Sequence, residues 1–99
     1  MKQITTAVLK QWQAEGKDFL LVDVREEWER QQYHIDGLHI PMGQLISRQN
    51  ELPKDKDVVL YCEKGIRSVI AIQRLEASGF NNLVNLAGGM RAWKEADRP

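Results

Sequence analysis

The sequence has 99 residues, of which 42% are hydrophobic and 28% are charged, and its 14 basic and 14 acidic residues give a formal charge of zero. This length predicts one domain over residues 1–99, with no room for a second hydrophobic core. The balanced charge argues against nucleic acid or an anionic membrane as the main partner.

The cysteine content and the apolar runs indicate where the protein acts. One cysteine cannot form an internal disulfide, whereas small secreted domains usually depend on several. No apolar run approaches the roughly 18 residues of a membrane span, and the first six residues lack the apolar core of a signal peptide. We expect a cytoplasmic protein and, since nothing in the sequence demands a dimer, a monomer.

Short strands and helices are predicted to alternate in the first half of the chain. The apolar run 19–24 is typical of a parallel strand that is buried on both faces. The predicted elements in chain order are an edge strand at Ile4, a helix capped by Thr5 or Thr6 and ended by Gly16, the strand over 19–24, a short helix over 25–30, a turn over 34–37 and a brief strand over 38–40.

The same alternation continues in the second half. The predicted elements are one or two helical turns within 43–52, a charged loop over 53–57, a buried strand over 58–61, a helix from Arg67 or Ser68 to Gly79, a strand over 83–86, a turn at Gly88-Gly89 and a helix over 90–96. Such a pattern predicts an α/β domain whose mostly parallel sheet is covered by helices on both faces.

Three of the predicted strands end in unusual residues. These ends are residues 23–25, Cys62 with its loop, and residues 87–89. Ligands of open parallel sheets bind beyond the C-terminal strand ends. We therefore expect the three ends to be neighbours and to form the site.

Cys62 has two interpretations. A lone cysteine at the end of an apolar strand is most often a core residue. The residues that follow favour a reactive thiol, because Gly65 permits backbone conformations in which successive N–H groups converge, and Arg67 adds a permanent cation. The converging N–H groups and the N-terminus of the next helix would favour an anionic sulfur.

Several motifs, in order along the chain, give the sequence a resemblance to the rhodanese (thiosulfate sulfurtransferase) homology family. They are Asp23-Val24-Arg25-Glu26 with Glu27-Trp28, His34-Ile35 with Gly37, Ile40-Pro41, the loop Cys62-x-x-Gly65-x-Arg67-Ser68, and Leu86-Ala87-Gly88-Gly89-Met90-x-Ala92-Trp93. Two residues depart from the family pattern, since Tyr33 stands where glycine is usual and Leu38 where a small residue is common. The resemblance implies a rhodanese-like open, mostly parallel sheet of about five short strands with helices on both faces.

The resemblance also implies the transfer of sulfane sulfur. Cys62 would attack the outer sulfur of thiosulfate or another sulfane-sulfur donor, hold it as a persulfide, and pass it to a thiol, cyanide or protein acceptor. Arg67 would help to hold an anionic donor. The loop residues whose backbone amides would cradle the persulfide are Glu63, Lys64, Gly65, Ile66, Arg67 and Ser68. No cofactor is implied, and His34 and His39 lack metal-ligand spacing.

Other activities are compatible with the same architecture. Phosphatases and arsenate reductases use a Cys-x5-Arg loop around a tetrahedral oxyanion, whereas Cys62 and Arg67 have Cys-x4-Arg spacing, which fits one sulfur atom better. A sulfur carrier that delivers its persulfide to a partner protein is a second alternative. A silent regulatory domain is a third, which the intact Cys62 and Arg67 disfavour.

The remaining candidates are the charged loop residues, two residues of the Asp23 motif and the tryptophans. Glu63, Lys64 and Arg67 sum to a charge of only plus one, which predicts a modest affinity for thiosulfate and a preference for a persulfide donor. Asp23 and Arg25 are candidate supporting residues that could orient the loop or touch the substrate. The favoured alternative is a structural role, with Asp23 accepting loop N–H bonds and Arg25 pairing with a nearby acid such as Glu29. Three residues are expected to be core or rim aromatics: Trp12, Trp28 and Trp93.

Overall fold

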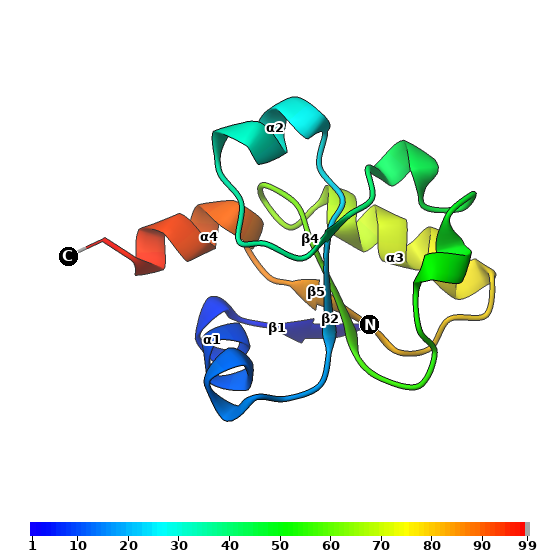
Figure 1. Cartoon of the computed structure of the whole chain (residues 1–99), viewed down its shortest axis with the longest axis horizontal. Helices are drawn as coiled ribbons and strands as arrows, with labels where there is room; N and C mark the ends of the chain where they lie inside the picture. Colours follow the sequence, from blue (N-terminus) through cyan, green and yellow to red (C-terminus); the bar gives the residue numbers. More distant parts are fainter. Residues whose placement is uncertain (99) are drawn as a thin grey trace.

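Short apolar runs form the strands of a parallel sheet in this computed structural model, which describes residues 1–98 (Figure 1). Over that range the five strands are β1 (Lys2–Ile4), β2 (Leu20–Asp23), β3 (Leu38–His39), β4 (Val58–Tyr61) and β5 (Leu83–Leu86). Every residue of β4 and of β5 is buried, as expected for strands that helices cover on both faces. The predicted α/β class is confirmed.

The helices follow the capping signals in the sequence. Within residues 1–98 they are α1 (Thr6–Glu15), α2 (Glu27–Gln32), α3 (Arg67–Ala77) and α4 (Gly89–Ala96), with 3-10 turns at Met42–Gln44 and Gln49–Glu51. The Thr5 hydroxyl accepts the Val8 N–H at 3.2 Å and Gly16 ends α1 in the left-handed conformation, so both predicted caps are confirmed. None of these helices has the length and apolar character needed to cross a membrane.

The strand order β1-β5-β4-β2-β3 places β4 at the centre, and every pairing among the described strands is parallel. The C-terminal ends of β2, β4 and β5 therefore lie side by side. The Val24 N–H donates to the Tyr61 carbonyl at 3.0 Å, and the Met90 N–H donates to the Cys62 carbonyl at 2.9 Å. The expectation that the three unusual strand ends are neighbours is confirmed.

Successive residues of each strand face opposite layers of the core, as the two-residue period of a strand requires. Leu60 and Leu83 pack with Ile72 and Leu75 of α3 on one face. The other face packs against α1 and α4, and its cluster includes Leu9, Val59, Val84, Met90 and Trp93. Figure 1 shows α3 on one side of the sheet with α1 and α4 on the other.

Two local expectations differ from the structure. Helix α2 begins at Glu27 rather than at Arg25, because Glu26 is its N-cap and forms a capping box with Glu29. Arg25 therefore lies before the helix. Trp93 is buried and Trp12 packs at the edge of the core, as predicted, but Trp28 is 62% exposed and belongs to neither core cluster.

Candidate active site

The Cys62 sulfur lies at the C-terminal end of the central strand, where the chain turns into α3. Cys62 as a whole is 1% exposed. The Gly65 N–H donates to Sγ at 3.1 Å, the Ser68 N–H donates at 3.4 Å, and the Ser68 hydroxyl oxygen lies 3.4 Å from Sγ. Of the loop amides predicted to cradle the sulfur, those of Gly65 and Ser68 face it here. Two N–H donors favour an anionic sulfur over a neutral one.

Tight backbone contacts hold the loop in this shape. Gly65 has a φ of +86°, and a Cβ added there would lie 2.9 Å from the Gly88 nitrogen. A Cβ at Gly89 would lie 2.3 Å from the Cys62 carbonyl oxygen, which receives the Met90 N–H, while the Glu63 carbonyl receives the Arg91 N–H at 2.9 Å. The Gly88-Gly89 pair thus forms the predicted turn and also lets α4 approach the loop closely.

Arg67 is paired with an acid from another element. Its two terminal nitrogens donate to the two carboxylate oxygens of Glu29 on α2, both at 2.7 Å. This pairing keeps the pKa of Glu29 below its ordinary value, because the hydrogen bond from Arg67 outweighs the opposing effect of burial. Arg67 lines the cavity in front of Cys62, but the negative charge of Glu29 already balances its positive charge.

Asp23 and Arg25 form a buried pair beneath the loop. Arg25 donates to Asp23 from its backbone N–H and from two guanidinium nitrogens at 3.0 to 3.1 Å, and it also donates to the Tyr33 carbonyl at 2.7 Å. Asp23 accepts N–H bonds, but its donors are Arg25 and Arg30 rather than the predicted loop residues. Arg25 pairs with acids, as predicted, but these are Asp23 and Glu63 rather than Glu29, because Arg25 precedes α2 and points to Asp23.

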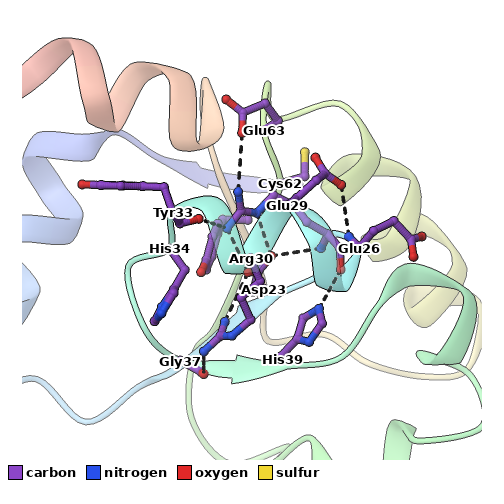
Figure 2. Close-up of polar contacts among 12 residues, drawn as sticks. Asp23, Glu26, Glu29, Arg30, Tyr33, His34, Gly37, His39, Cys62 and Glu63 are labelled. Carbon is purple, nitrogen blue, oxygen red and sulfur yellow. Dashed lines mark hydrogen bonds and ion pairs between the residues drawn. The ribbon is translucent and has the colours of Figure 1, made fainter.

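This buried network reaches the Cys62 loop through Glu63. Arg25 lies 3.5 Å from the Glu63 carboxylate, and Arg30 donates to Asp23 at 3.2 Å (Figure 2). Burial raises the pKa of Asp23, but the hydrogen bonds from Arg25 outweigh it, and the pKa lies below its ordinary value. Burial raises the pKa of Tyr61, whose ring lies beneath the Arg25 guanidinium, to about 12.

The sulfur opens into a cavity of about 380 Å³. Its lining residues are Glu29, Cys62, Glu63, Lys64, Ile66 and Arg67. The negative charges of Glu29 and Glu63 cancel the positive charges of Lys64 and Arg67. The sequence did not predict Glu29 at this site, and its presence lowers the net charge of the lining from plus one to zero. A smaller depression of about 200 Å³ adjoins it, and Glu29 and Glu63 line both.

The histidines have local partners. The His34 Nδ1 atom accepts the Asp36 N–H at 3.0 Å within the predicted turn. His39 Nε2 lies 2.7 Å from the Arg25 carbonyl, and its Nδ1 lies 3.2 Å from Glu27. Among residues 1–98, no group of three or more His, Cys, Asp or Glu residues is arranged to hold a metal ion.

Sequence reasoning missed Asn85, which is buried on β5 beside the loop. Its side chain contacts Ser68 and the Gly65 carbonyl. The signal was present, since Asn85 is the polar member of the otherwise apolar strand Leu83–Leu86.

Known proteins match the whole of this architecture. The rhodanese-like domain family matches residues 5–96. A sulfurtransferase of Allochromatium vinosum is 40% identical over 100 residues, which cover 100% of this chain and 94% of that protein. The thiosulfate sulfurtransferase GlpE of Coxiella burnetii is 33% identical over 88 residues, covering 87% of this chain and 82% of that protein. The crystal structure of a rhodanese-like domain protein from Staphylococcus aureus has a TM-score of 0.86 at 37% identity, covering 94% of this chain and 91% of that one.

Proposed function

This chain belongs to the rhodanese-like family, and we propose on that premise that it is a sulfurtransferase acting through a persulfide on Cys62. The observation that carries the proposal is the Cys62 sulfur at the end of β4, facing the Gly65 and Ser68 N–H groups of the loop from Cys62 to Ser68. These donors would stabilise both the attacking thiolate and the persulfide that replaces it.

The proposed reaction has two displacement steps at one sulfur atom. The Cys62 thiolate attacks the outer sulfur of thiosulfate, the sulfur–sulfur bond of the donor breaks, and sulfite leaves with the electron pair. An acceptor nucleophile such as cyanide or a thiolate then attacks the outer sulfur of the persulfide. The bond to Cys62 breaks, the thiolate is restored, and the acceptor carries the sulfur away.

The size of the loop favours sulfur transfer over phosphoryl chemistry. The loop presents two N–H donors at 3.1 and 3.4 Å to one sulfur atom. Arg67, which would clamp an oxyanion in a phosphatase, is held by Glu29 through two bonds of 2.7 Å. A phosphatase activity requires this ion pair to open, so we expect no hydrolysis of p-nitrophenyl phosphate.

The cleanest experiment uses the lone cysteine. Incubation with thiosulfate should add the mass of one sulfur atom, dithiothreitol should remove it, and cyanide should yield thiocyanate. Cys62→Ser, the matched control, should show neither adduct nor product. Wild-type protein that gains no sulfur from thiosulfate or from any persulfide donor would contradict the proposal.

A second candidate is a sulfur carrier that passes its persulfide to a partner protein without efficient turnover on thiosulfate. The charge-neutral cavity and two exposed apolar residues, Ile66 (63%) at the cavity and Trp28 (62%) at the adjoining depression, favour a donor or acceptor group carried on a partner protein. A stable adduct with little thiocyanate formation would select this candidate.

The donor preference is tested by Glu63→Gln. Removing this carboxylate leaves the cavity with one net positive charge, so the KM for thiosulfate should fall about threefold at low salt and the gain should vanish at high salt. Glu76→Gln, on an exposed part of α3, makes the same charge change away from the cavity. An unchanged KM for Glu63→Gln at low salt would show that the loop charge does not select the donor.

A further inference from the structure

Asn85 occupies a position at which the strand pattern requires an apolar side chain. It shares the α3 face of β5 with Leu83, which belongs to the core cluster, and it is 1% exposed. A buried amide is unfavourable unless its donors and acceptor are all paired. The arrangement of those bonds therefore shows what the side chain holds in place.

The partners of Asn85 fix the orientation of its amide group. Its Nδ2 donates to the Gly65 carbonyl at 3.3 Å and to the Gln3 side-chain oxygen at 3.0 Å. A backbone carbonyl can only accept, so the nitrogen must face Gly65 and the oxygen must face the other way, toward Ser68. The Ser68 hydroxyl then donates its hydrogen to Asn85 Oδ1, in a contact of 2.5 Å.

That donation determines what Ser68 presents to Cys62. With its one hydrogen directed to Asn85, the Ser68 hydroxyl turns a lone pair toward the Cys62 sulfur, 3.4 Å away. A lone pair accepts the S–H of a thiol and repels an anionic sulfur. The Gly65 and Ser68 N–H groups on the same sulfur act in the opposite sense.

We infer that Asn85 is a positioning residue that sets the ionisation of Cys62 through the Ser68 hydroxyl. In the resting site the S–H bond points to Ser68 and the Ser68 hydrogen points to Asn85. When the sulfur gives up its proton to water at the mouth of the cavity, the hydroxyl turns from Asn85 to the anion. No proton passes to Asn85, because an amide oxygen is too weak a base to accept it.

The charged groups around the sulfur are left unchanged by the substitutions used in the test below. They are Arg25 after β2, Glu29 of α2, Glu63 and Lys64 of the loop, Arg67 of α3 and Lys94 of α4. The loop has further support from the Gly65–Gly88 contact and from the Met90 and Arg91 N–H bonds. Losing the longer Asn85–Gly65 bond should therefore matter less than losing the short bond to Ser68.

The test is the pH profile of Cys62 alkylation by iodoacetamide, which reports on one thiol because the chain has one cysteine. Asn85→Leu frees the Ser68 hydroxyl for the sulfur, so the midpoint of the profile should move down by about one pH unit. Asn85→Asp keeps the acceptor and adds a negative charge, so its midpoint should move up by a similar amount. Opposite shifts from two destabilising substitutions distinguish this role from a merely structural one.

Two controls complete the design. In a Ser68→Ala background the shift of the alkylation midpoint caused by Asn85→Leu should disappear. This comparison tests the role of Asn85 even if Asn85→Asp does not fold. Asn82→Asp, an equivalent change just before β5 at a residue that binds the Pro53 and Lys56 carbonyls, should lower stability without moving the midpoint. Equal shifts with and without Ser68, shifts of the same sign in both variants, or no shift at all would overturn the inference. It rests on the proposed role of Cys62 as nucleophile, but alkylation needs no sulfur donor, so the two proposals fail separately.

Discussion

Charged side chains gather at both ends of the sheet, and the two groups differ in burial. At the C-terminal strand ends, here called the site end, Asp23 is 0% and Arg25 is 1% exposed. At the opposite end, here called the far end, Lys56 and Asp18 form a pair of 3.1 Å whose side chains are 34% and 85% exposed.

The comparison shows that the same residue types contribute differently to stability when they are buried and when they are exposed. A buried pair cannot be replaced by water, so each partner is held in one position and holds its neighbours. An exposed pair exchanges freely with water and contributes little. The buried Asp23–Arg25 pair therefore fixes the chain at the end of β2, beside the Cys62 loop, whereas an exposed pair such as Lys56–Asp18 leaves the far-end loops less constrained.

The largest difference between the two ends should follow removal of a buried charge. Asp23→Asn leaves the Arg25 guanidinium buried without its carboxylate, and we expect a loss of about 3 kcal/mol in the free energy of unfolding, measured by urea denaturation. Asp18→Asn makes the same change at the far end. Similar losses in both variants would remove the distinction between the ends.

The next effect concerns the close approach of α4 to the loop. Gly89→Ala places a Cβ against the Cys62 carbonyl, where 2.3 Å is available, and should cost about 2 kcal/mol while slowing persulfide formation. At Gly79, beyond α3, a Cβ meets no atom of the described chain within 4 Å. Gly79→Ala should cost about 1 kcal/mol from its positive φ alone and leave persulfide formation unchanged.

A smaller effect is expected from the partly exposed pair Glu29–Arg67. The folded state lowers the pKa of Glu29 from its ordinary 4.5, so the unfolded chain binds more protons near that pH. The stabilisation is present above about pH 4.5 and is lost as the pH falls through the lowered value. Glu29→Gln should reduce the free energy of unfolding at pH 7 by on the order of 1 kcal/mol. It should also weaken the dependence of the urea denaturation midpoint on pH in the acid range. A profile that stays as steep as that of the wild type would show that Glu29 does not contribute to the loss of stability in acid.

The smallest effect is expected at the far end. Lys56→Ala removes the exposed pair with Asp18 and should change the free energy of unfolding by less than about 0.5 kcal/mol. Urea denaturation at low and high salt gives the measurement. A loss above 1 kcal/mol, or a strong dependence on salt, would show that this pair is structural after all.

Local signals explain why much of the fold was predictable. The runs 58–61 and 83–86 are apolar and bounded by polar residues, and their predicted limits match β4 and β5. The Cys62 loop was found because glycine and arginine stand at short, fixed distances from the cysteine along the chain. Both signals depend on residues close together in the sequence.

Contacts between distant segments explain the errors. Glu29 lies four residues after Arg25, which invited a helical pairing, but the capping box starts α2 after Arg25. The true partner of Glu29, Arg67, is 38 residues away, and no spacing rule connects them. The sequence predicts Trp28 at the core or its rim because large aromatic side chains are usually at least partly buried, whereas in the structure Trp28 is 62% exposed.

The pairing of β1 with β5 has a consequence for the order in which this protein folds. These are the first and last strands of the described chain, and Gln3 of one reaches Asn85 of the other across 82 positions. Pairings of such long range form late, because the entropy of closing a large loop must be overcome first. The polar contact between Gln3 and Asn85, beside the Cys62 loop, is therefore expected to be among the last parts of the described structure to assemble.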